Sequence, residues 1–200
     1  RELQQAHEET GATPRVVFLQ NHGVFVAGDS LVDIQETYEE IMATLRDRYL
    51  EAGVPTALEV GILDEQAVRD EAPVVRTLLG KDRRRSVVTA AEPFRVVRGP
   101  LSPDHIVYAR SFPAMWADDA AGLRAFQAER GYPPKVVGLD DKAVLCVGDN
   151  LKEARAARIA ARDAALVQQL TEAFGGPRFL TQIQYGFIEN WEVESYRRDR

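Results

Sequence analysis

The sequence has few of the side chains that build disulfides and metal sites. It contains one cysteine, Cys146, and three histidines, His7, His22 and His105, in 200 residues. A single cysteine excludes an internal disulfide and any zinc site built from several cysteines, and it fits a reducing compartment such as the cytoplasm. No two histidines lie closer than 15 residues, so His-x-His and His-Glu-x-x-His motifs are missing. A histidine metal site would therefore need distant residues to converge.

Other signals are missing as well. No apolar run approaches the ~18 residues of a membrane span, and no secretory signal is visible. The phosphate-binding Gly-x-Gly-x-x-Gly and Walker loops and the Gly-x-Ser-x-Gly nucleophile turn do not occur. A net charge of −6 disfavours broad binding to nucleic acid or anionic membranes. The basic run at 81–85 has no interleaved aromatic residues, which favours a solvated linker. We therefore expect a cytoplasmic protein with neither a nucleic-acid nor a membrane partner.

The remaining composition is that of a folded globular protein. Hydrophobic residues make up 45% and charged residues 28% of the chain, which excludes a disordered protein. A chain of this length buries roughly 70% of its unfolded surface and needs no disulfide or metal to fold. It has room for one large domain or two half-size ones.

The chain repeats itself at an offset of 120 residues. The segment 16–31 returns without a gap as 136–151. Identities fall at Val16/Val136, Val17/Val137, Leu19/Leu139, Val24/Val144, Gly28/Gly148, Asp29/Asp149 and Leu31/Leu151. Any two strand–turn–strand–helix units share a hydrophobic pattern, but seven identities in sixteen positions favour common origin.

Each copy predicts a strand, a polar turn, a second strand and a capped helix. Ser30 and Asn150 both stand three residues before a carboxylate, as at a helix start. The first helix should run to about Ala52, with Gly53 as its stop, and the second is rich in alanine. We therefore predict an α/β fold with a layered, mixed β-sheet flanked by helices and a duplicated strand–turn–strand–helix unit.

The rest of the chain gives weaker patterns. Residues 63–79 predict one or two short helices broken at Pro73, and residues 118–129 predict a helix. Apolar runs at 87–88 and 106–109 predict strands.

His22 is the strongest candidate for chemistry. It lies in a turn between two strands, where a fixed backbone can present an open side chain, and a neutral imidazole there could bind zinc. The alternative is a turn histidine that bonds its own loop. The second copy has Lys142 in its place, which cannot act as a neutral nitrogen ligand. His105 follows Ser102-Pro103-Asp104, which favours a capping Asp and a packed His, and His7 predicts only helix surface.

The first copy resembles the class II aldolase/adducin family. Residues 17–29, with Asn21-His22-Gly23, match a turn that supplies one of three zinc-binding histidines in its sugar-phosphate aldolases. Residues 99–107, the second copy and the ending at 188–198 resemble a longer branch, which includes rhamnulose-phosphate aldolase domains that can be fused to a short-chain dehydrogenase. The resemblance implies a zinc cofactor with His22 as a metal ligand, a sugar-phosphate substrate and a homo-oligomer.

The family's other motifs are not found. Its His-x-His pair, catalytic carboxylate and phosphate-binding residues precede the Asn-His-Gly turn, whereas 21 residues precede His22 here and none matches. We therefore expect the C-terminal portion of a zinc-dependent class II aldolase-like lyase, which cleaves a carbon–carbon bond to a keto-phosphate and an aldehyde and is inactive as this chain alone. Residues 1–82 would be the end of the aldolase-like unit, and 83–200 a degenerate second unit with a tail. The alternative is a non-catalytic aldolase/adducin-fold module for interaction or assembly.

Overall fold

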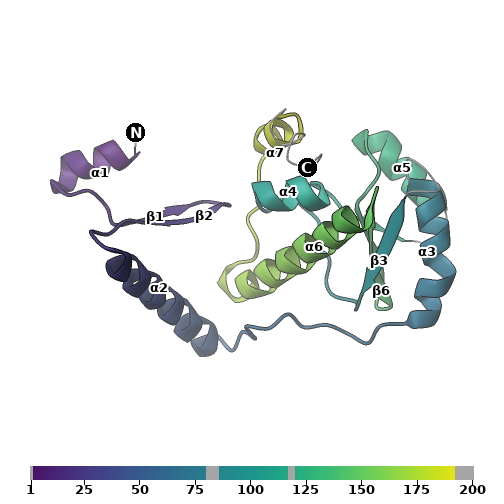
Figure 1. Ribbon diagram of the computed structural model, residues 1–200, viewed down its shortest axis with the longest axis horizontal. Coiled ribbons are helices and arrows are strands. Elements are labelled where there is room, and N and C mark those ends of the chain that lie inside the picture. Colours follow the sequence, from purple (N-terminus) through teal and green to yellow (C-terminus); the bar gives the residue numbers. More distant parts are fainter. Residues whose placement is uncertain (1, 80–85, 117–119, 192–200) are drawn as a thin grey trace. The chain divides into compact units, whose positions relative to one another are not determined.

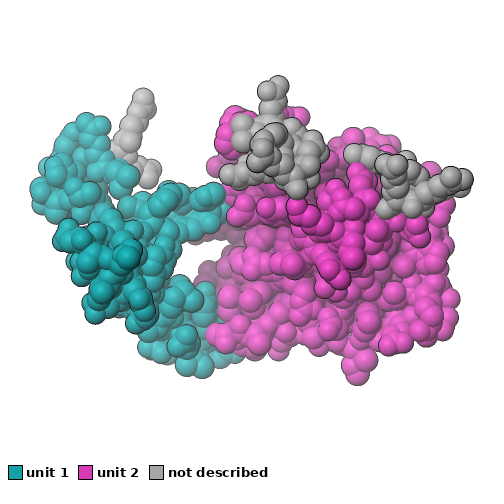
Figure 2. Space-filling model, viewed as in Figure 1, with its two compact units in different colours: residues 1–54 teal, residues 55–200 magenta. Residues whose placement is uncertain are grey.

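The computed structural model describes residues 2–79, 86–116 and 120–191. The chain forms two compact units, Arg1–Val54 and Pro55–Arg200 (Figure 2). The domain boundary predicted after residue 82 and the basic run at 81–85 lie outside the described residues. Residues 55–79, which the sequence assigns to the first aldolase-like unit, belong to the second compact unit.

Unit 1 is a helix followed by a hairpin and a long helix. Its elements are α1 (Glu2–Thr10), β1 (Val16–Leu19), β2 (Gly23–Val26) and α2 (Leu31–Glu51). The two strands pair antiparallel. A capping box starts α2: the Ser30 hydroxyl accepts from the Asp33 N–H at 3.1 Å, and the Asp33 carboxylate accepts from the Ser30 N–H at 3.2 Å. Gly53 follows the helix with a φ of +66°, so the predicted stop is confirmed.

Unit 2 contains a mixed four-stranded sheet. Its strands are β3 (Val87–Ala91), β4 (Ala114–Met115), β5 (Val136–Leu139) and β6 (Ala143–Gly148). They lie in the order β3-β6-β5-β4, with β4 parallel to β5 and the other neighbours antiparallel.

Helices cover both faces of this sheet. They are α3 (Glu65–Leu79), α4 (Pro103–Ala109), α5 (Ala120–Arg130), α6 (Leu151–Thr171) and α7 (Gln182–Glu189), with a 3-10 turn, η1 (Glu172–Phe174), after α6. One face packs against α3 and α5, the other against α6, and α4 lies against α6 (Figure 1). The predicted mixed α/β architecture is thus confirmed. None of the helices in the described part of the chain is long and apolar enough to cross a membrane.

The core follows the alternation of the strands. Val137, Leu139 and Leu145 belong to the cluster with α3 and α5, whereas Val136 and Val144 belong to the cluster with α6. The buried residues of α6 are six alanines and one glutamine: Ala154, Ala157, Ala160, Ala161, Ala164, Ala165 and Gln168. These small side chains let α6 lie close to the sheet and to α4.

The structure repeats the 120-residue offset in its backbone. The pairs Val16↔Val26 and Val136↔Cys146 occupy the same register position, and α2 and α6 begin and end at matching residues. The Ala27 N–H donates to the Arg15 carbonyl at 2.8 Å, and the matching bond runs from Val147 to Lys135 at 2.9 Å. The sequence repeat is therefore also a repeat of hydrogen-bond register.

The two copies differ in burial. Every residue of β5 and β6 is buried, because α-helices cover both faces of their sheet. In unit 1 none of the residues 3–54 is buried, including the apolar face of α2. The acidic residues Glu36, Glu39 and Glu40 are exposed, as the sequence predicts. The first copy therefore has the same hairpin and long helix as the second, but the described residues of unit 1 form no buried core.

The predicted strand at 106–109 is wrong, because these residues form the end of helix α4. Ser102 is its N-cap and accepts from the His105 N–H at 3.4 Å, and Pro103 occupies the first turn. Ile106 and Val107 are buried on this helix. The N-cap Ser102 and the following Pro103 favour a helix here more strongly than the β-branched Ile106 and Val107 favour a strand, because strand preference depends on context.

The predicted break at Pro73 is also wrong, because α3 continues from Glu65 to Leu79. Pro73 lies on the exposed face of the helix, where water can satisfy the carbonyl that loses its partner. On the opposite face Val68, Val75 and Leu79 pack into the core. This packing holds the helix together across the proline.

Cys146 is expected to be inert in the folded protein. Burial raises the pKa of its thiol to about 12, with Arg158 acting in the opposite direction. Near pH ~8 only about one thiol in ten thousand would be ionised, against roughly a tenth in the unfolded chain. A coloured disulfide reagent should therefore label no thiol in native protein and one per chain in concentrated guanidinium. Rapid labelling of native protein would show that β6 opens readily.

Candidate functional site

His22 lies at the tip of the β1–β2 hairpin in unit 1. Its backbone N–H donates to the Leu19 carbonyl at 3.1 Å, and Asn21 takes the left-handed conformation with a φ of 58°. The imidazole is exposed. A β-carbon added at Gly23 would meet nothing within 4 Å, so no close backbone approach requires this glycine. The turn therefore fixes the backbone of His22 and leaves its ring open to an outside group.

The described residues do not complete a zinc site around His22. They contain no group of three or more His, Cys, Asp or Glu side chains that could hold a metal ion. A catalytic zinc takes three protein ligands and keeps one open position. On this structure His22 can supply one ligand, and no reaction step follows from one ligand alone.

The second copy provides an internal comparison for His22. Lys142 occupies the same turn position, and its N–H donates to the Leu139 carbonyl at 2.9 Å. Its carbonyl accepts from the Asp64 N–H at 2.9 Å, while its side chain is exposed. The turn geometry is thus preserved with a different side chain at its tip.

His105 links α4 to α6. Its Nδ1 lies 2.9 Å from the Ser102 hydroxyl, and its Nε2 lies 2.9 Å from an Asp163 carboxylate oxygen. The histidine side chain is 14% exposed and that of Asp163 is 64% exposed. An ionised Asp163 can only accept, which assigns the ring proton to Nε2 and lets the hydroxyl donate to Nδ1. The prediction of a packed histidine is confirmed, although the capping residue is Ser102.

The Ser102–His105–Asp163 chain has the order of a nucleophile, a base and an orienting carboxylate. The Ser102 hydroxyl, however, also caps α4. The cavity beside His105 has a volume of about 30 Å³, which is room for about one water molecule. These contacts join α4 to α6.

A second polar cluster lies next to α7. The Arg110 guanidinium lies 5.1 Å from the ring centre of Tyr132, and that of Arg130 lies 4.0 Å from the ring centre of Phe112. Burial of the ring, followed by the charge of Glu189 on α7, raises the pKa of Tyr132. The cluster therefore keeps a neutral tyrosine next to the glutamate of α7.

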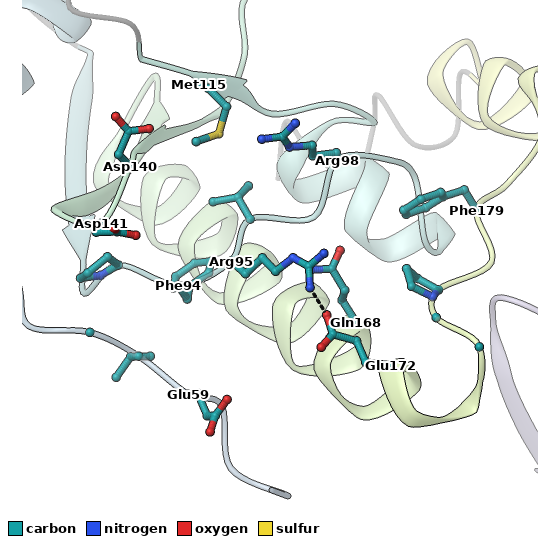
Figure 3. Close-up of a pocket in the computed structure, with 17 residues that line it drawn as sticks. Glu59, Phe94, Arg95, Arg98, Met115, Asp140, Asp141, Gln168, Glu172 and Phe179 are labelled. Atoms are coloured by element: carbon teal, nitrogen blue, oxygen red, sulfur yellow. Dashed lines mark hydrogen bonds and ion pairs between the residues drawn. The ribbon is translucent and has the colours of Figure 1, made fainter. Parts of the chain in front are cut away.

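Unit 2 contains an open groove of about 1500 Å³ (Figure 3). Five parts of the chain line it: residues 59–61, the segment 93–98, Met115, the β5–β6 turn, and the end of α6 with the residues after it. Gln169 fixes one wall, because its side chain bonds the Pro55 and Ala57 carbonyls at 2.9 and 2.8 Å. It also accepts from the Glu59 N–H at 2.9 Å.

The groove carries both signs of charge. Its lining includes Arg95 and Arg98 together with four carboxylates, those of Glu59, Asp140, Asp141 and Glu172. Arg95 is directed toward Glu172 and pairs with it (Figure 3). The described lining contains no histidine, cysteine, serine or threonine, and its ionisable side chains are arginines and carboxylates.

No family model, curated protein or solved structure matched this chain. The class II aldolase/adducin resemblance thus rests on the Asn-His-Gly turn and the motifs around it. The sequence singles out His22, His105 and Lys142 but not the groove. The arginines of the groove come from an irregular segment whose neighbours are distant in the sequence, and no local pattern connects them.

Proposed function

We propose that this chain is part of a zinc-dependent class II sugar-phosphate aldolase-like lyase, to which it contributes His22 as one metal ligand. The observation that supports the proposal is the hairpin tip, where a bonded backbone holds an exposed imidazole in an Asn-His-Gly turn. The other ligands and the proton-transferring carboxylate would come from outside the described residues. The substrate would be a keto-sugar phosphate, and the assembled protein a homo-oligomer.

The role of this chain within such a site is to position a nitrogen ligand. The strands β1 and β2 fix the turn on both sides, and Asp33 closes the start of the following helix. Pairing of the two strands reduces the conformational freedom that metal binding would otherwise remove. A neutral imidazole at this tip can bind zinc with either ring nitrogen.

Replacing His22 with alanine should remove zinc from the protein produced from its natural reading frame. We expect close to one zinc per chain in the parent, measured by elemental analysis after dialysis, and a decrease of at least about tenfold in His22→Ala because one of three ligands is lost. Lys142→Ala is the matched control, since it changes the same turn position of the second copy and should leave zinc unchanged. Aldol cleavage should decrease together with zinc.

Equal, near-zero zinc in the parent and in His22→Ala would contradict the ligand assignment. Equal loss of zinc in His22→Ala and Lys142→Ala would show a nonspecific effect of the substitutions. The 200-residue chain alone should show no aldol cleavage, and metal-dependent turnover by it would contradict a role limited to one ligand.

A further inference from the structure

The two copies of the repeat have different neighbours in their sheets. Strand β6 lies between β5 and β3, whereas β2 pairs only with β1 in the described part of unit 1. In unit 2 the residues 144–148 pair antiparallel with β3. The same residues of the first copy are 24–28, and no described strand lies on their outer side. In unit 2, therefore, the equivalent edge is covered by strand β3.

The outer edge of β2 presents backbone groups that no described strand pairs. The Ala27 N–H donates to the Arg15 carbonyl, and hydrogen bonds of an antiparallel pair alternate along each strand. The N–H groups of Val24, Val26 and Gly28 therefore point away from β1. Such an edge is a template for pairing with another extended chain.

The side chains beside this edge are apolar and exposed. Phe25 is 62% exposed, whereas its counterpart Leu145 is 0% exposed. The Phe18 side chain is also exposed, and α2 has no buried residue. Burial of apolar surface contributes about 25 cal/mol per Å² to the free energy of association, so a chain that covers these side chains would bind more tightly. Both the backbone and the side chains of the first copy thus lack the cover that the second copy has.

We propose that the β2 edge, residues 24–28, is a docking site for an extended segment of a partner polypeptide, which adds a strand antiparallel to β2. In the register of β3 on β6, Ala90 stands opposite Leu145 and Thr89 opposite Cys146. The partner segment therefore carries a small residue opposite Phe25 and an uncharged one opposite Val26. The proposal does not depend on whether His22 binds zinc.

The charge of α2 defines the partner further. This helix carries six carboxylates and two arginines. A second copy of this chain, paired through β2 about a two-fold axis, would bring two acidic helices to one face of the joined sheet, which is unfavourable. A segment flanked by lysine or arginine would instead complement α2. The partner is thus an apolar strand with basic flanks, and not another copy.

In both copies a side chain of the long helix, α2 or α6, donates a hydrogen bond to a backbone carbonyl at this edge or on the strand that covers it. In unit 2 Arg158 of α6 donates to the Ala90 carbonyl of the covering strand at 3.3 Å. Tyr38 holds the same position on α2, and its hydroxyl donates to the Val24 carbonyl at 3.4 Å. The Tyr38 hydroxyl therefore occupies an edge acceptor that an added strand would take over.

Strand addition can be tested with a peptide that carries the sequence of β3. The probe is a synthetic peptide with the sequence of Ser86–Ala91 followed by two lysines, added to the full chain. We expect amide exchange, measured by NMR, to slow by at least about tenfold at Val24, Val26 and Gly28. The Phe25 amide, which faces β1, and the Ala27 amide, which donates to the Arg15 carbonyl, should change less. Val26→Pro removes one outward N–H and should abolish the protection, while Val26→Ala should retain it.

A second peptide, with two glutamates in place of the lysines, tests the charge argument without altering the protein. It should bind at least about tenfold more weakly at low salt. Absence of protection with the lysine peptide would overturn the docking site. Protection of the same amides without peptide, increasing with protein concentration, would overturn the choice of partner in favour of a second copy. Equal binding of both peptides would overturn the proposed basic flanks.

Discussion

Replacing Gly148 with alanine is expected to destabilise unit 2 by about 3 kcal/mol, because the added methyl group has no space. A β-carbon at this position would lie 2.4 Å from the Ala154 backbone nitrogen and 2.7 Å from the Glu153 β-carbon. These atoms belong to the first turn of α6, which is held against the sheet by its buried alanines. Either β6 or the helix would have to move.

Urea unfolding followed by tryptophan fluorescence measures this effect, since Trp116 is buried in the core between the sheet and α3. Gly28→Ala is the matched control. There the β-carbon would lie 2.9 Å from the Asp33 side chain and 3.2 Å from the Ile34 nitrogen. Because α2 has no buried residue, it can shift, and we expect a cost below about 1 kcal/mol by circular dichroism. Equal costs in the two variants would contradict the difference in packing between the copies.

Leu145→Ala is expected to cost about 3 kcal/mol, within the range for buried leucines. The side chain is fully buried and belongs to the cluster with Val75, Leu123 and Val137. Its removal would leave a cavity that the surrounding elements cannot close. The same urea titration gives the free energy of unfolding of unit 2.

Phe25→Ala is the matched substitution in the first copy. Phe25 is mostly exposed, so its loss should change stability by no more than about 0.5 kcal/mol, although the side chain removed is larger. Circular dichroism of the whole chain measures this effect. A cost for Phe25→Ala close to that of Leu145→Ala would show that a partner or a second copy already covers β2 in solution.

The sequence predicts those parts of the fold that depend on local signals. The repeat, both hairpins and the caps at Ser30 and Asn150 follow from short patterns, and the structure confirms them. Helix α4 is not predicted, because the β-branched Ile106 and Val107 favour a strand and the cap is expected at Asp104, whereas the structure has it at Ser102. The continuity of α3 across Pro73 depends on packing against the sheet, which no local pattern contains.

The candidate sites likewise differ in how far local sequence patterns predict them. A turn between two apolar runs predicts the exposed position of His22, and the structure places it there. The groove is not predicted, because Arg95 and Glu172 come together only through the docking of the segment 93–98 on the end of α6. Zinc binding by His22 stays a prediction, because the other ligands would come from outside the described residues.

The repeated hairpin also has a consequence for the order of folding. In unit 1 strand β2 contacts β1 and α2, its neighbours along the chain, so little loop-closure entropy is lost. In unit 2 strand β3 must find β6 across the whole of α4, β4, α5 and β5. Long-range pairing of this kind slows folding. The two hairpins therefore start from the same local pattern, but the second reaches its final environment only after a distant strand has arrived.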